Sequence, residues 1–170
     1  MKKLYFVRHG LSEMNRLGMR AGQIETPLTE KGRRQAKEAG RFVKQYGIDY
    51  IICSPLGRAY ETACIIAKEI RYPVDQIEQN SLLLERSFGP LEGQPWSPDV
   101  NLDGFADVET FDSVAARARM ALDHIRQLPA STILIVGHST FGRALLHVLH
   151  PDEPTIASGH LKNAEVIRLE

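Results

Sequence analysis

The stretch LYFVRHG at residues 4–10 decides how the rest of the chain is interpreted. Four apolar residues stand together and are followed at once by Arg8, His9 and Gly10. An apolar run this short, bounded by charge and glycine, is typical of a buried strand. We therefore expect a strand over residues 4–7 that carries an arginine and a histidine at its carboxyl end.

Two further short apolar runs, at residues 49–53 and 133–136, predict buried strands of the same kind. The first runs into Ser54, and the second runs into Gly137 and His138. All three of these strands therefore end at polar groups. Residues 82–84 are expected to be a short strand or an extended edge, and residues 164–169 are expected to be the last strand.

Helical patterns alternate with these strands. Residues 29–46 begin with Thr29, which suits an N-cap, and are followed by Gly47, which suits a helix stop. Four apolar residues of this segment are expected on one buried face: Ala36, Ala39, Phe42 and Val43.

Ser54 and Pro55 suit the cap and the first turn of a second helix, which extends to about residue 70 and carries Arg58. Two more helices share the pattern of a polar cap followed by apolar residues: one from Asp107 or Thr110 to Gln127, and one from a cap at Ser139 to His150.

Strands that alternate with helices predict an α/β fold. We expect a three-layer α/β/α sandwich with a mostly parallel central sheet, formed by residues 1–170 as a single domain. Residues 87–107 differ from the rest, because Gly, Pro and Asp alternate there with aromatic residues. Because these aromatic residues need a surface to pack on, we expect a small cap or loop insertion rather than a linker.

The carboxyl ends of parallel strands meet at one edge of a sheet, where α/β proteins bind their ligands. Arg8 and His9 follow the first strand, and His138 follows the strand at residues 133–136. Arg58 falls in the first turn of the helix after Ser54. The sequence therefore predicts one pocket that contains two arginines and two histidines.

The composition of 43% apolar and 25% charged residues is typical of a globular protein. Lys plus Arg and Asp plus Glu number 21 each, so no basic excess favours nucleic acid or a membrane surface as partner. The N-terminal apolar run is too short for a signal peptide, and Cys53 and Cys64 fit no metal or redox spacing. We expect a cytoplasmic monomer or homodimer that has no nucleic acid or membrane partner.

Arginine presents a planar fork that matches phosphate oxygens. Two guanidiniums and a cationic imidazole would neutralise a phosphate dianion and the charge on its equatorial oxygens. The other imidazole can be the nucleophile if one ring nitrogen is unprotonated and directed at phosphorus. Glu85 is the candidate for protonating the leaving oxygen, because a neighbouring phosphate charge favours a protonated carboxyl group.

These residues resemble the signature blocks of the histidine phosphatase superfamily, also called phosphoglycerate-mutase-like. The resemblance covers nearly the whole chain, and a set of ordered blocks is far more specific than one short motif. The blocks are Arg8-His9-Gly10 with Ser12 and Asn15; Pro27-Leu28-Thr29 with Gly32, Gln35-Ala36 and Gly40; Ser54-Pro55-Leu56-Gly57-Arg58-Ala59 with Thr62-Ala63; Leu84-Glu85-Arg86 with Phe88-Gly89, Leu91 and Glu92-Gly93; and Val136-Gly137-His138-Ser139.

The resemblance implies a role for each residue. His9 would carry a phosphohistidine, while Arg8, Arg58 and His138 would bind the phosphoryl group. Glu85 would protonate the leaving group and then act as base for water. The superfamily uses neither a metal nor an organic cofactor. Four further residues would bind substrate: Ser12, Asn15, Gly22 and Gln23.

Each of these residues also has a simpler interpretation. A histidine at a strand end can be a satisfied core residue, and Arg58 alone could be a surface charge of its helix. Glu85 could form a salt bridge with Arg86, which would contribute little to stability. Asn15 could cap a turn.

The cap bears on the choice among phosphatase, mutase and a non-catalytic phosphate-ligand or protein-binding module. No Lys or Arg occurs between Arg86 and Arg117, and an acidic cap is a poor clamp for a multiply anionic substrate. We therefore expect hydrolysis of a small phosphorylated substrate, a monoester whose leaving group is neutral, apolar or cationic. Phe88 also stands where mutases of the superfamily tend to have tyrosine, which is a further departure from a mutase. The acidic residues of this stretch are Glu92, Asp99, Asp103, Asp107, Glu109 and Asp112.

Overall fold

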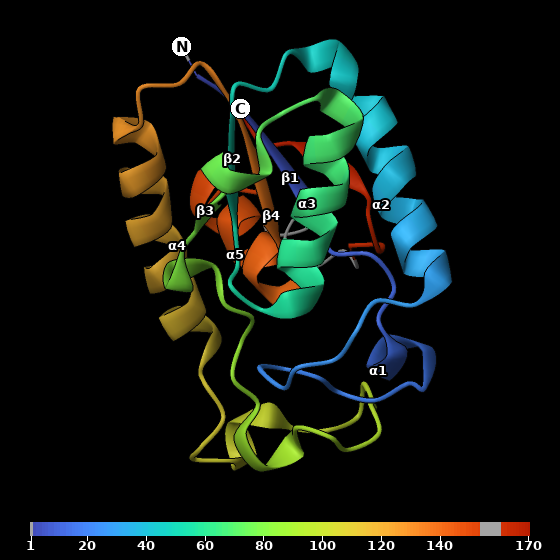
Figure 1. Ribbon diagram of the computed structural model, residues 1–170. Coiled ribbons are helices and arrows are strands. Elements are labelled where there is room, and N and C mark those ends of the chain that lie inside the picture. Colours follow the sequence, from blue (N-terminus) through green and yellow to red (C-terminus); the bar gives the residue numbers. More distant parts are fainter. Residues whose placement is uncertain (1, 154–160) are drawn as a thin grey trace.

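The computed structural model describes residues 2–153 and 161–170 and shows a mixed five-stranded sheet at its centre (Figure 1). The strands lie in the order β3-β2-β4-β1-β5. Four of them are parallel to one another, and β5 is an antiparallel edge strand beside β1, so the expected mostly parallel sheet is confirmed. The bounds are β1 (Lys3–Arg8), β2 (Tyr50–Cys53), β3 (Glu78–Gln79), β4 (Thr132–Gly137) and β5 (Val166–Arg168).

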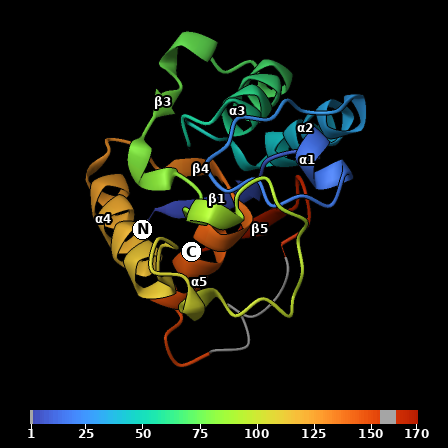
Figure 2. The same cartoon turned by 90° about the horizontal axis from the view of Figure 1, so that it is seen from below.

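Helices cover both faces of the sheet. Figure 2 shows α2 and α3 on one face and α4 and α5 on the other, which confirms the three-layer α/β/α architecture. The α-helices are α1 (Glu13–Arg16), α2 (Glu30–Val43), α3 (Gly57–Ile70), α4 (Phe111–Gln127) and α5 (Ser139–Leu149). Short 3-10 turns lie at Lys44–Tyr46, Val74–Gln76, Ser81–Leu83, Gly89–Leu91 and Leu102–Gly104.

The central strands are apolar on both sides because both of their faces are covered. In β1, Leu4 and Phe6 pack into the core beneath α4 and α5. Tyr5 and Val7 pack into the opposite core, beneath α2 and α3. The short apolar run that opens the sequence is therefore a strand buried between two helical layers.

The register of the sheet brings the polar strand ends together. Arg8 pairs with Gly137 across β1 and β4, and Cys53 pairs with Val136 across β2 and β4. The backbone N–H of His9 donates to the carbonyl of Gly137 at 2.9 Å. The loops coloured blue and yellow-green in Figure 1 lie beyond this same end of the sheet.

The two helices with their own polar caps begin where the sequence predicts. Thr29 caps α2, and its hydroxyl accepts a hydrogen bond from the Gly32 N–H at 2.9 Å. Gly47, which was expected to stop this helical segment, follows the 3-10 turn Lys44–Tyr46 and has a left-handed φ of 63°. Thr110, rather than Asp107, caps α4. Phe42, expected on the buried face of α2, is instead half exposed.

The prediction that Ser54 and Pro55 begin a helix was wrong, because α3 begins at Gly57. The Ser54 hydroxyl accepts from the Leu56 N–H at 3.3 Å and forms a turn ahead of the helix. The first N–H of α3, from Gly57, is satisfied by the carboxylate of Glu25 at 3.0 Å. The cap of this helix thus comes from a distant part of the chain.

The prediction of a strand at residues 82–84 was also wrong. Asn80 accepts a hydrogen bond from the Leu82 N–H at 3.0 Å and starts the 3-10 turn Ser81–Leu83. Leu83 is nevertheless fully buried in the core. The strand of this region is β3, which pairs with β2 just before that turn.

The segment at residues 87–107 is joined to the chain just after α1. The Arg20 N–H donates to the Gln94 carbonyl, and the Gly93 N–H donates to the Arg20 carbonyl, each at 2.8 Å. The Trp96 N–H donates to the Gly18 carbonyl at 2.8 Å. These hydrogen bonds place Arg20 against the cap segment. In the described part of the chain, no helix is long and apolar enough to cross a membrane.

Candidate active site

His9 follows β1 and is only 3% exposed. Its Nδ1 lies 2.7 Å from the carbonyl oxygen of Gly10, and Nε2 lies 3.3 Å from the Nε–H of Arg58. A carbonyl can only accept and a guanidinium can only donate, so Nδ1 carries the proton and Nε2 carries the lone pair. Nε2 is therefore the ring nitrogen that is chemically able to act as a nucleophile.

Arg58 stands in the first turn of α3 and is 2% exposed. Its two terminal nitrogens donate to the carbonyls of Ile24 at 2.8 Å and Gly22 at 2.5 Å. Gly22 has a φ of +53°, and a Cβ there would lie 2.3 Å from a carboxylate oxygen of Glu92. Glycine at this position thus lets the backbone hold the Arg58 guanidinium beside His9.

Arg8, the last residue of β1, is also buried. Its Nη1 donates to the Leu161 carbonyl at 2.7 Å. Burial lowers the pKa of Arg8 and of Arg58, and the negative charge of Glu85 partly offsets that effect on each. Two guanidiniums and one carboxylate therefore share the electrostatic environment of His9.

His138 follows β4 and is fully buried. Its ring lies 5.3 Å from the His9 ring, centroid to centroid, at an angle of 61°. Its Nε2 lies 2.8 Å from the Ser54 hydroxyl, while its buried Nδ1 has no hydrogen-bond partner among the described residues. The expected juxtaposition of two imidazoles with Arg58 is thus present.

Both imidazoles are neutral at pH 7 in this state. Burial and the nearby guanidiniums of Arg58 and Arg8 hold the pKa of His9 well below its usual 6.5. Burial, Arg58 and His9 itself lower the pKa of His138 in the same way. The expectation that one imidazole is cationic beside a bound phosphate dianion stays a prediction, because the two guanidiniums alone disfavour a further positive charge whereas a dianion would favour it.

Glu85 is 8% exposed and lies at the N-terminus of α5. Its carboxylate accepts hydrogen bonds from the backbone N–H groups of Arg86 at 2.8 Å, Thr140 at 3.1 Å and Phe141 at 3.2 Å. These bonds explain why Ser139 is the first residue of α5 and not its cap, as had been predicted. Glu85 satisfies the N–H groups that a cap would have satisfied.

Ser12 and Asn15 form a capping box at α1. The Asn15 N–H donates to the Ser12 hydroxyl, and the Ser12 N–H donates to the Asn15 amide oxygen, each at 3.2 Å. The Asn163 amide bridges this helix to the site, because its Nδ2 donates to the His9 carbonyl at 3.0 Å and to Asn15 at 3.3 Å. These two residues order the loop after His9.

Gln23 lies beside Glu85. Its side-chain amide donates to the Glu85 carbonyl at 3.0 Å, and its backbone N–H donates to the Glu92 carboxylate at 3.1 Å. The structure thus joins Gly22 and Gln23 to Arg58 on one side and Glu85 on the other.

The chain matches the histidine phosphatase superfamily (branch 1) over residues 4–170. It belongs to that superfamily. The order of sequence blocks that suggested the relationship and the meeting of their residues in the fold agree with this match.

Two curated relatives and one solved structure illustrate the range of this superfamily. The chain is 32% identical to the uncharacterized phosphatase PhoE of Bacillus subtilis, over 100% of this chain and 89% of that protein. It is 40% identical to a probable phosphoglycerate mutase, GpmB, of Photorhabdus laumondii, over 81% of this chain and 70% of that protein. A phosphoserine phosphatase mutant of Entamoeba histolytica, solved with phosphoserine, has a TM-score of 0.82 at 27% identity, over 99% and 90%.

Sequence reasoning missed several residues that position the site. Thr62 accepts from the Gly10 N–H at 3.1 Å and fixes the turn after His9. Ser54 was interpreted only as a helix cap, whereas its hydroxyl meets His138. Thr62 and Ser54 both lie inside a recognised block, so the block itself was the available signal. Asn163 lay in no block and gave no signal.

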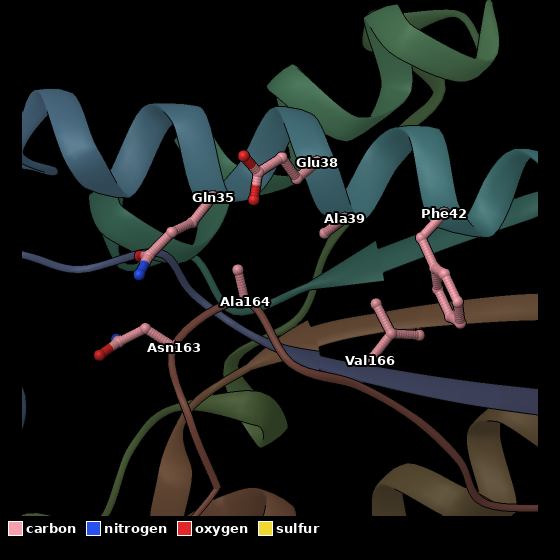
Figure 3. Close-up of a pocket in the computed structure, with 7 residues that line it drawn as sticks. All are labelled: Gln35, Glu38, Ala39, Phe42, Asn163, Ala164 and Val166. Carbon is pink, nitrogen blue, oxygen red and sulfur yellow. The ribbon is translucent and has the colours of Figure 1, made fainter.

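Two cavities flank this cluster. One of about 560 Å³ lies between α2 and residues 163–166, and Figure 3 shows Phe42 near Val166 at one end, with Gln35 and Asn163 at the other. The second, of about 260 Å³, lies beneath the cap and next to Thr140. Within the described ranges, no three His, Cys, Asp or Glu side chains gather in a group that could hold a metal ion.

The premise that the cap offers an acidic surface does not hold for the cavity beneath it, because no described Asp or Glu lines that cavity. That cavity is lined by Arg20, Arg86 and Arg143, all of which lie outside the cap segment at residues 87–107. Glu109 is engaged in an ion pair with Arg117 at 2.9 Å. Three further described acidic residues between Arg86 and Arg117 are exposed: Asp99, Asp107 and Asp112. The fourth, Glu92, accepts hydrogen bonds from the backbone N–H groups of Gln23 and Phe88.

Proposed function

We propose that this protein hydrolyses phosphomonoesters of small metabolites, without a metal, by transferring the phosphoryl group to Nε2 of His9 and then to water. The observation that carries the proposal is the state of His9. Its Nδ1 is bound to the Gly10 carbonyl, and its Nε2 keeps a lone pair among Arg8, Arg58 and His138. A buried, neutral imidazole beside fixed cations suits nucleophilic attack on a phosphate dianion.

In the first step, His9 Nε2 forms a bond to phosphorus while the bond between phosphorus and the leaving oxygen breaks. Arg8 and Arg58 neutralise charge on the transferred group, and Glu85, protonated when the phosphate dianion approaches, gives its proton to the leaving alcohol. In the second step, Glu85 removes a proton from water, the water oxygen bonds to phosphorus, and the phosphorus–nitrogen bond breaks. Inorganic phosphate and the starting form of His9 result.

A phosphoglycerate-type mutase is the second candidate, and two observations favour it. The relatives include proteins named as phosphoglycerate mutases, and three arginines line the cavity beneath the cap. A mutase would return the phosphoryl group to the bound organic acid and not to water. Identity of 32% with a protein named as a phosphatase, over the whole chain, supports hydrolysis.

Release of inorganic phosphate from 4-nitrophenyl phosphate, with EDTA present, tests the proposal. We expect steady turnover that EDTA does not change, and a loss of at least about a thousandfold in His9→Ala. The matched control is His150→Ala, which alters a partly exposed histidine just after α5.

Three results would count against the proposal. Loss of turnover on chelation would show a metal requirement, and turnover in His9→Ala would require another nucleophile. No turnover of any monoester would favour a non-catalytic phosphate-ligand or protein-binding module. With a phosphoglycerate as substrate, formation of its isomer in place of free phosphate would favour the mutase.

A further inference from the structure

The cavity of about 260 Å³ beneath the cap lies next to the group proposed to protonate the leaving oxygen. Thr140 lines this cavity, and its backbone N–H donates to a carboxylate oxygen of Glu85 at 3.1 Å. Arg86, which follows Glu85 in the chain, lines it as well. Arg8, His9, Arg58 and His138 do not line it, so it is separate from the phosphoryl-binding groups.

The described residues that line this cavity include three arginines and no Asp or Glu. Arg20 comes from the loop after α1, Arg86 immediately precedes the cap segment, and Arg143 comes from α5. Three cations around one small space raise the local concentration of anions and disfavour cations there.

Arg20 is the most informative of the three because it is buried without a counter-ion. It is 7% exposed, and no ion pair to it occurs within the described residues. Its guanidinium has a long hydrogen bond of 3.4 Å to the Ser97 carbonyl and lies 5.1 Å from the centre of the Phe88 ring. A buried cation with such weak partners is costly unless an anion joins it.

The walls of the cavity also include aromatic rings. Phe88 contacts Arg20 and Arg86, whose guanidinium carbons lie 5.1 and 5.5 Å from its ring centre. Trp96, 59% exposed, forms part of the rim. A cavity of roughly 150 Å³ is enough to hold benzene, so this one has room for a flat or compact organic group with a charged substituent.

We propose that this cavity binds the alcohol portion of the substrate and that Arg20 and Arg143 hold a second oxyanion, a carboxylate or a second phosphate, on that portion. The inference rests on the proposed function, because the leaving group must lie beside Glu85. It narrows the substrate to a phosphomonoester whose alcohol is itself anionic. Guanidinium forks match both kinds of oxyanion.

Three aryl monophosphates test the proposal: phenyl phosphate, 4-carboxyphenyl phosphate and 4-(phosphonomethyl)phenyl phosphate. The first has no second anion, the second has a planar carboxylate, and the third has a tetrahedral phosphonate that cannot be hydrolysed. The kcat/KM of each is measured for the natural sequence and for Arg20→Gln and Arg143→Gln. Arg34→Gln, an exposed arginine of α2, is the matched control.

The decisive quantity is the ratio of kcat/KM for an anionic substrate to kcat/KM for phenyl phosphate. Differences in leaving-group chemistry cancel when this ratio is compared between variants. We expect Arg20→Gln to lower it about 10- to 100-fold, as the loss of a charged hydrogen bond does, and Arg34→Gln to leave it unchanged. The anionic substrate whose ratio falls further in Arg20→Gln shows whether the cavity prefers a carboxylate or a phosphate.

Two outcomes would overturn the inference while leaving the proposed function intact. In one, phenyl phosphate is hydrolysed as well as both anionic substrates. In the other, Arg20→Gln and Arg143→Gln leave both ratios unchanged. If no substrate is hydrolysed, the proposed function fails. Calorimetric binding of the three compounds to His9→Ala, with and without Arg20→Gln, then still tests the cavity. Equal affinity of the protein for all three compounds would overturn the inference.

Discussion

Glu85 acts on two parts of the molecule at once. Its carboxylate satisfies the first N–H groups of α5 through Thr140 and Phe141, and its charge acts on Arg8 and Arg58. A group that anchors a helix is held in one place, which is what a proton donor to a departing oxygen requires. The resemblance implied a catalytic role for Glu85, which stays a prediction. The capping role could not be predicted, because its partners lie more than fifty residues away.

Replacing Glu85 by glutamine separates leaving groups that need a proton from those that do not. We expect kcat/KM for an alkyl phosphate to fall by about 10²- to 10⁴-fold, because general acid catalysis is lost. The loss for 4-nitrophenyl phosphate is expected to be far smaller, since its phenolate leaves without protonation. Steady-state kinetics with the two substrates measures the difference. Equal losses for both would assign Glu85 a structural role only.

At the scale of elements, the start of α2 packs directly on the turn that follows His9. A Cβ on Gly32 would lie 2.2 Å from the Leu11 carbonyl oxygen, and one on Gly10 would lie 2.3 Å from the Gly32 carbonyl oxygen. Backbone thus meets backbone with no room for a side chain. This contact, together with the Thr62 hydroxyl, fixes the turn that presents His9.

Gly32→Ala is therefore expected to destabilise the protein, although alanine ordinarily favours a helix. The overpacked contact should lower the free energy of unfolding by about 1–3 kcal/mol. Urea unfolding measures this, and Gly104→Ala is the matched control because a Cβ there meets nothing within 4 Å. A Gly32→Ala protein as stable as the control would mean that the turn after His9 is not held by this contact.

Elements were predictable from sequence where their signals are local. Thr29 and Thr110 cap their helices through side chains that lie next to them in the chain, and both were found. The starts of α3 and α5 were misplaced because Glu25 and Glu85, far away in sequence, satisfy their N–H groups. The apolar segment at residues 82–84 places Leu83 in the core, which a 3-10 turn achieves as well as a strand.

At the scale of the whole molecule, the charges counted along the sequence did not predict which charged side chains gather around the cavity beneath the cap. The net charge is zero, and the cap segment itself is acidic. Folding brings Arg20 and Arg143 to the cavity beneath that segment and leaves its described aspartates in solvent. The fold and the cluster of two arginines and two histidines followed from ordered sequence blocks, whereas the cavity depends on contacts between segments with no shared motif.

Stability should depend on pH through the two neutral imidazoles. The unfolded chain binds protons on His9 and His138 below pH about 6.5, while the folded chain, whose pKa values for them are lowered, does not. Stability therefore falls as pH decreases below about 6.5, by up to about 1.4 kcal/mol per pH unit for each imidazole. Urea unfolding between pH 5.5 and 7.5 measures the slope.

The variant His138→Asn isolates one of these groups. Its slope below pH about 6.5 should be smaller than that of the natural sequence by up to about 1.4 kcal/mol per pH unit. An unchanged slope would mean that His138 takes up a proton in the folded state as readily as in the unfolded state.

Direct detection of the covalent intermediate tests the central claim. The protein is mixed with a reactive monophosphate, quenched in alkali, digested and examined by mass spectrometry. We expect one phosphoryl group on the peptide that contains His9, stable in alkali, lost in acid and absent from His9→Ala. Turnover without any phosphorylated peptide, or a phosphoryl group on a residue other than His9, would contradict the account.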